Sequence, residues 1–129
     1  MGKEVQSGMT IDDAAIKNKE PQVPIAKTDL VFLQPSGTKT NATVGISAPV
    51  SVDEGHSFQC RVFFGHFDEP KDITGIDSLQ AVCLALIQLK RRLKAYEDEL
   101  GWKIYFAEEG SELSLCDPEL EFSVDAHFG

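Results

Sequence analysis

The stretch "GIDSLQAVCLALIQLKRRLKAYEDELG", residues 75–101, predicts one long amphipathic helix. Asp77 is a favoured N-cap residue, and Gln80 three positions later completes a variant of the capping box. Gly101 stands where a C-terminal cap is expected. Between these caps, apolar residues recur at spacings of three and four and form one stripe: Leu79, Val82, Leu86, Leu89, Leu93, Tyr96 and Leu100. We therefore expect a helix of roughly 22 residues, or ~33 Å.

The first half of this helix is predicted to be the more deeply covered half. Cys83, Leu84 and Ile87 widen the apolar stripe in the first three turns. We expect Val82 and Leu86 to face a sheet there. Later in the helix the opposite face becomes charged. The second half should therefore project from the domain or lie over the edge of a sheet.

Period-two patterns before the helix predict strands. The segment "DLVFLQ", residues 29–34, is apolar on both faces, and residues 42–52 alternate between apolar and polar or small side chains. Residues 58–64, "FQCRVFF", follow the turn "DEGHS", so we expect an antiparallel hairpin. Pro49 cannot donate a ladder hydrogen bond and should mark an edge, a bulge or the end of pairing.

After the helix, "WKIYFA" and "ELSLC", residues 102–107 and 112–116, are short strand candidates. Residues 120–128, "LEFSVDAHF", alternate cleanly and predict a further strand. The order of strands, one helix and strands predicts an α+β domain, an antiparallel sheet covered on one face by one long α-helix. We expect residues 28–129 to form this single domain and residues 1–27, polar and with two prolines, to form a flexible N-terminal arm.

Composition argues against several classes of protein. A chain of 129 residues fits one domain, and its longest purely apolar run, residues 81–87, is too short to cross a bilayer. The first residues contain no apolar signal-peptide core, so we expect a cytoplasmic protein. The cysteines Cys60, Cys83 and Cys116 are odd in number and widely spaced, which indicates neither a disulfide framework nor a structural zinc site.

The net charge of −9 is concentrated at the C-terminal end. Acidic and basic residues balance through residue 96, whereas residues 97–129 contain ten acids against Lys103 alone. Such a surface repels nucleic acid and attracts a basic protein partner. The candidate partner-binding residues are Glu108, Glu109, Glu112, Glu119 and Glu121. The basic quartet of Lys90, Arg91, Arg92 and Lys94 could instead pair with these acids inside the domain.

Two resemblances involve the start of the long helix. The triplet Asp77-Ser78-Leu79 resembles the signature of acyl and peptidyl carrier proteins, which implies a phosphopantetheine attached to Ser78. Carrier proteins are small helical bundles with a helix about 30 residues upstream, whereas this chain has strand patterns there, and capping alone accounts for the motif.

A wider resemblance covers roughly residues 45–101. The run "GIDSLQA" followed by "LAL", residues 75–81 and 84–86, resembles a family of small bacterial domains of unknown function. This resemblance implies a related fold and no established activity.

No spacing indicates a catalytic or metal centre. His66, Asp68 and Glu69 are close in sequence but lack a helical i, i+4 pair or a distant histidine partner, so we expect no metal and no cofactor. We therefore expect a non-enzymatic protein-interaction module, in a specific form an immunity or inhibitor-type protein for a basic effector such as a nuclease. The alternative is a carrier or small enzyme acting at the Ser78 helix N-terminus. The partner, any ligand and the oligomeric state stay open.

Overall fold

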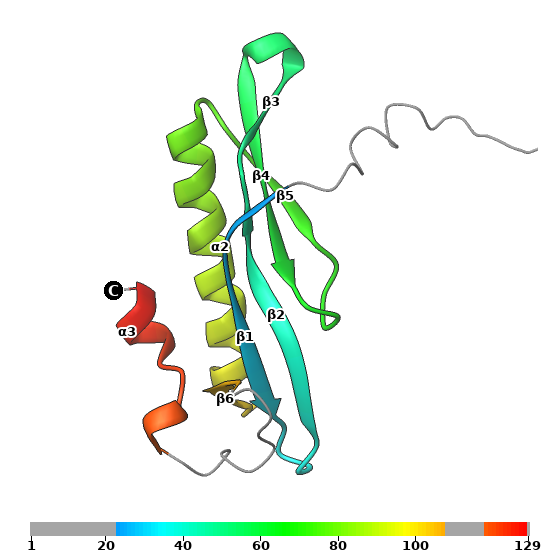
Figure 1. The fold of residues 1–129 in the computed structure, drawn as a ribbon, viewed down its shortest axis with the longest axis vertical. Helices are drawn as coiled ribbons and strands as arrows, with labels where there is room; N and C mark the ends of the chain where they lie inside the picture. The colour runs from blue at the N-terminus through cyan, green and yellow to red at the C-terminus, as the bar shows by residue number, and fades with distance from the viewer. Residues whose placement is uncertain (1–22, 108–117, 129) are drawn as a thin grey trace, which may run out of the picture.

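Six strands form one antiparallel sheet with a long helix along one face, in a computed structural model that describes residues 23–107 and 118–128 (Figure 1). The α+β prediction is confirmed. The strand order is β3-β4-β2-β1-β6, with β5 paired to β4. The elements, in chain order, are β1 (Pro24–Leu33), β2 (Lys39–Ser47), β3 (Val50–Val52), the 3-10 helix η2 (Asp53–Gly55), β4 (Ser57–Phe64), β5 (Lys71–Gly75), α2 (Ser78–Asp98), β6 (Lys103–Phe106), the 3-10 helix η4 (Pro118–Leu120) and α3 (Val124–Phe128).

Strand β1 has different neighbours along its length. It pairs with β2 from Leu33↔Lys39 to Pro24↔Ser47, with an irregularity between Pro24 and Ala26. On its other side β6 pairs only with residues 30–33. Because β1 begins at Pro24, residues 24–27, which we expected in the N-terminal arm, belong to the sheet. The break between β2 and β3 falls at Ala48 and Pro49, where pairing was predicted to end.

The core lies between the sheet and α2. Alternate residues of the strands face the helix, so each strand contributes every second side chain to the core. The strand residues of this core that are essentially inaccessible to solvent are Leu30, Phe32, Val44, Ile46, Cys60, Val62, Phe64 and Ile104. Val31 and Tyr105 form a much smaller buried cluster of their own.

The face of α2 that meets the sheet differs from the predicted stripe. Its buried residues are Ala81, Ala85, Leu89, Leu93 and Tyr96. At the start of the helix the contact is between small residues, because a Cβ placed on Gly75 would lie 2.5 Å from the Ala81 backbone nitrogen. Small residues allow the helix to approach the sheet closely at this end.

The prediction that the first half of α2 is deeply covered is therefore wrong. Leu86, expected to face the sheet, is 37% exposed, and Leu79 is 72% exposed. Cys83 is also exposed, as is Ile87. The predicted stripe counted large apolar side chains only. The closely packed Ala81 and Ala85 instead rotate the contact face away from these residues.

Both ends of α2 are closed by hydrogen bonds. The Asp77 carboxylate accepts from the Gln80 backbone N–H at 2.8 Å, and the Gln80 side-chain carbonyl accepts from the Ile76 N–H at 2.8 Å. At the other end Gly101 has a φ of +71°, and the Trp102 N–H donates to the Tyr96 carbonyl at 2.9 Å. The left-handed conformation of Gly101 turns the chain back at the end of the helix, and glycine adopts it without steric cost. No helix among the described residues has the length and apolar composition required to span a bilayer.

An aromatic cluster fixes the last turns of α2. Tyr96 stacks on Trp102 with ring centroids 4.9 Å apart, and Phe67 lies edge-on to Phe32 at 4.8 Å. The Tyr96 hydroxyl donates to the Asp68 carboxylate. Burial, together with this hydrogen bond, raises the pKa of Tyr96. The cluster connects the β4–β5 loop to the C-terminal end of the helix.

The C-terminal strand predicted over residues 120–128 is wrong. This segment contains the end of η4, a single bridge between Tyr105 and Glu121, and the helix α3. Ser123 provides the local reason, because its hydroxyl accepts from the Ala126 N–H at 3.2 Å and its carbonyl from the His127 N–H at 3.1 Å. The candidate strand "ELSLC" lies outside the described residues.

Candidate binding site

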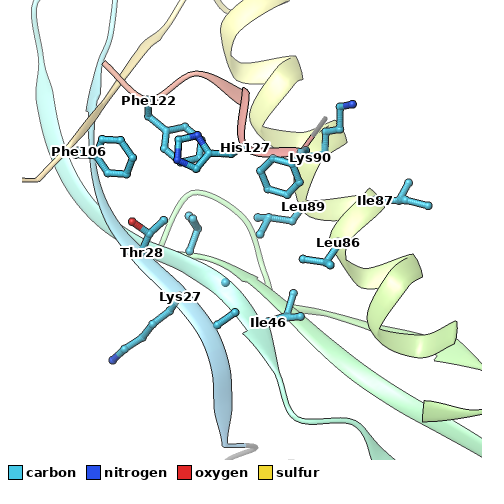
Figure 2. Close-up of a pocket in the computed structure, with 14 residues that line it drawn as sticks. Lys27, Thr28, Ile46, Leu86, Ile87, Leu89, Lys90, Phe106, Phe122 and His127 are labelled. Atoms are coloured by element: carbon cyan, nitrogen blue, oxygen red, sulfur yellow. The ribbon is translucent and has the colours of Figure 1, made fainter. Parts of the chain in front are cut away.

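A groove with a volume of about 430 Å³ lies between α2, the strands β1 and β2, and α3 (Figure 2). We call it the apolar groove. The helix side is formed by Leu86, Ile87, Leu89 and Lys90, and the sheet side by Ala26, Lys27, Thr28, Val44, Gly45 and Ile46; Phe106, Phe122, His127 and Phe128 complete its lining. Its volume is within the range of ordinary ligand and side-chain binding sites.

Small side chains on the sheet create the groove. In the first half of β1, the residues Ala26 and Thr28 line the groove, where the second half has the fully buried Leu30 and Phe32. These four residues share one face of the strand, because side chains alternate along it. The space over this face of β1 is therefore filled by large side chains in the second half of the strand and stays open in the first half.

Aromatic rings close one end of the groove. The His127 ring stacks on Phe122 with centroids 4.3 Å apart and an interplanar angle of 22°. Phe106 lies edge-on to Phe122 at 5.2 Å. His127 Nδ1 is 2.9 Å from the Ser123 carbonyl oxygen, so this nitrogen carries the hydrogen and the ring is held in place by α3.

An exposed apolar strip continues from the groove along α2. Leu79, Cys83, Leu86 and Lys90 follow one another at helical spacings of four, three and four, so they share one side of the helix. Leu86 and Lys90 line the groove. We define the exposed apolar strip as Leu79, Cys83, Leu86 and Ile87. An uncovered row of this kind on a helix is typical of a surface that contacts another molecule.

Acidic side chains from three segments lie near the C-terminal end of α2, close enough to influence the charge of Glu97. The pKa of Glu97 is raised, mainly because the side chain is partly buried. The positive charge of Lys94 lowers this pKa, whereas the negative charges of Asp98, Asp125 and Glu121 raise it further. We call Glu97, Asp98, Glu121 and Asp125 the acidic cluster. Lys94 donates to the Asp125 carboxylate at 3.0 Å, and this hydrogen bond raises the pKa of Lys94.

The predicted partner-binding acids are only partly within the described residues. Glu119 and Glu121 are exposed, on η4 and directly after it. Glu108, Glu109 and Glu112 lie outside the described residues.

The basic quartet divides between internal pairs and the groove. Lys94 pairs with Asp125 at 3.0 Å, and Arg92 Nε lies 3.6 Å from Asp68 Oδ2. Lys90 lines the groove, although its ammonium points away from the cavity in Figure 2. Part of the quartet therefore neutralises acids within the domain, one of them in the acidic cluster.

The helix start at Ser78 does not have the surroundings of a carrier protein. Ser78 is the first residue of α2 and is exposed, next to the capping carboxylate of Asp77. The region about 30 residues upstream forms β2 and β3, whereas a carrier bundle has a helix there. The chemistry around Ser78 is that of a capped helix end.

The candidate metal ligands and the cysteines lie in the following surroundings. Asp68 is engaged by Tyr96 and Arg92, and in the part of the chain that the structure describes no three histidine, cysteine or acidic side chains are placed so that they could hold a metal ion. Cys60 is buried, its thiol donates to the Ser47 carbonyl at 3.0 Å, and burial raises its pKa. A thiol in this state is a weak nucleophile.

The apolar groove was not predicted from the sequence. Its only sequence signal is the pair Ala26 and Thr28 on a strand whose later residues are large. Comparisons with protein-family models, with curated proteins and with solved structures found no match to this chain.

Proposed function

We propose that the protein is a protein-binding module without catalytic activity, and that it binds a basic partner through its acidic end. The observation that carries this proposal is the acidic cluster, to which the end of α2, the residue after η4 and α3 all contribute. Clustered acids at one end of a chain with a net charge of −9 attract a basic surface.

The electrostatics of Glu97 support this interpretation. Burial and the neighbouring acids disfavour the charged form of Glu97. Of the groups that shift this pKa, Lys94 is the one that favours the charged form. A partner cation placed beside the cluster would relieve this repulsion, as complementary charges do across interfaces. An inhibitor that covers the basic surface of an effector such as a nuclease is the specific form of module that we favour.

A charge-reversal experiment tests the proposal. The double variant Glu119→Lys/Glu121→Lys reverses two exposed acids at this end of the molecule. A matched control, Glu54→Lys/Glu69→Lys, makes the same change in net charge at two other exposed positions. Circular dichroism should show that both variants keep the fold, because exposed charges contribute little to stability.

The immobilised proteins are then compared by quantitative capture from an extract of the source organism at about 0.05 and 0.5 M salt. We expect a basic partner that the wild type and the control variant retain at low salt, and that the double variant at Glu119 and Glu121 loses. High salt should reduce this difference. Equal loss with both variants would point to net charge alone, and unchanged capture by the Glu119→Lys/Glu121→Lys variant at low salt would refute binding through the acidic end.

A further inference from the structure

Helix α3 shows what fits beside α2. It packs against the later turns of α2, with Val124 buried and Asp125 paired to Lys94 (Figure 1). Its last residues, His127 and Phe128, already line the apolar groove. Alongside α2, the short helix α3 therefore covers the later turns, and the groove leaves the earlier turns uncovered.

The open part has the dimensions of a helix face. From Leu79 to Lys90 the rise of 1.5 Å per residue gives roughly 16 Å, which corresponds to about three turns. Apolar side chains line it on the α2 side, with Leu86 and Ile87 opposite Ala26 and Thr28 of the sheet. Small floor residues beside larger ones leave room for inserted side chains, as in helix-in-groove recognition.

We propose that the apolar groove and the exposed apolar strip bind one amphipathic helix of the partner, laid beside α2 and carrying basic residues at its end nearest α3. This inference rests on the proposed function and adds the form of the partner's binding segment. The apolar anchors would recur at i, i+4 and i+7 to match Leu79, Cys83 and Leu86.

The charges near the groove bear on its occupant. Lys27 and Lys90 line the groove, but their ammonium groups point away from it in Figure 2. Glu121 and Asp125 lie in the same segment as Phe122 and His127, which close the groove, and Asp125 is paired with Lys94. A second copy of this chain would bring the same acids and another net charge of −9. A small apolar molecule could fill the groove but would leave Leu79 exposed, since that residue lies beyond the groove lining.

The test uses two synthetic peptides of about 14 residues. Because isolated helices of this length are marginal in water, their helix content on binding is followed by circular dichroism. Both have leucine at i, i+4 and i+7 positions and alanine at most others. The positions intended to lie nearest α3 carry lysine in one peptide and glutamate in the second. Each is titrated into the full-length ¹⁵N-labelled protein, with amide shifts as the readout. The groove variant is Leu86→Gln, at a residue that is 37% exposed. Its matched control is Leu84→Gln, at a residue that is 36% exposed and does not line the groove.

We expect the lysine peptide to shift the amides of Ala26, Thr28 and Leu86. Leu86→Gln should weaken its binding about tenfold, because an apolar contact is lost and an amide is buried without a partner. Leu84→Gln should change the affinity less than about twofold, and the glutamate peptide should bind at least about tenfold more weakly than the lysine peptide.

Several results would overturn the inference. Equal effects of Leu84→Gln and Leu86→Gln would mean that the groove is not the site. Groove shifts that depend on protein concentration without peptide would assign it to a second copy. Saturable binding of 1-anilinonaphthalene-8-sulfonate that depends on Leu86, without peptide binding, would assign it to a small molecule.

The same titration separates this inference from the proposed function. If Glu119→Lys/Glu121→Lys weakens the lysine peptide but Leu86→Gln does not, the groove inference fails and the acidic-end proposal stands. If both peptides bind equally well in a Leu86-dependent way, the groove remains a helix site and the preference for a basic partner is refuted.

Discussion

The substitutions Leu93→Ala and Leu86→Ala should destabilise the protein by clearly different amounts. Leu93 is fully buried on the face of α2 that contacts the sheet, whereas Leu86 is 37% exposed at the groove. Truncating Leu93 removes buried methyl groups and leaves a cavity, at a cost of about 3 kcal/mol in the free energy of unfolding. Truncating Leu86 removes partly buried groups and only enlarges an open groove, which should cost about 1 kcal/mol.

Urea denaturation provides the measurement. Trp102 is the only tryptophan and is stacked on Tyr96, so its fluorescence reports unfolding of the cluster at the end of α2. Circular dichroism at the same urea concentrations checks that unfolding is two-state. At roughly 4 °C per kcal/mol, the melting temperature should fall by about 12 °C for Leu93→Ala and about 4 °C for Leu86→Ala.

Equal costs for the two substitutions would refute the orientation of α2 described above. That result would restore the stripe predicted from large side chains, in which Leu86 faces the sheet. Leu84→Ala serves as the control, because Leu84 has nearly the same exposure as Leu86 and should show a similar small cost. Unchanged m values would confirm that the substitutions act on stability and not on the size of the unfolding transition.

Three further predictions concern other parts of the fold. Asp77→Ala should lower stability by about 1 kcal/mol through loss of the N-cap, and incubation with coenzyme A and a promiscuous phosphopantetheinyl transferase should leave the protein's mass unchanged; a gain of one phosphopantetheine at Ser78 would contradict this. Gly75→Ala should raise the urea sensitivity markedly, because the added methyl meets the Ala81 backbone; a wild-type midpoint would show that β5 and α2 can separate without cost. The fold raises the pKa of Tyr96, so the contribution of this residue to the free energy of unfolding is fully present below about pH 10 and is lost as the pH rises further. The stability of Tyr96→Phe should therefore fall less with alkali than that of the wild type. Parallel curves of stability against pH above about pH 10 would argue against the raised pKa.

The sequence allowed the α+β class, the helix bounds and most strands to be predicted, because these depend on local signals. Asp77 and Gly101 mark the ends of α2, and alternation marks the sheet. The orientation of the helix could not be predicted in the same way. It depends on how closely Ala81 and Ala85 approach Gly75, and small residues give little signal in a pattern of apolar side chains.

The C-terminal segment and the groove show two other limits. In residues 120–128 the alternation was real, since Phe122 and Val124 are both buried, but Ser123 starts a helix between them. The groove arises from residues far apart in the chain, which meet only when β1, α2 and α3 are assembled. The acidic end was visible in the composition, whereas the convergence of Glu97 with Glu121 and Asp125 required the fold.

The position of β6 has a consequence for biosynthesis. Strand β1 finds its first partner in β2, a few residues later, but its second partner is β6, which follows the whole of α2. During synthesis the outer edge of residues 30–33, which includes Val31 and Phe32, therefore remains unpaired until the chain has passed residue 106. An apolar strand edge left open for that long can pair with another nascent chain. Truncation before Lys103 should thus yield aggregates and not a smaller folded domain.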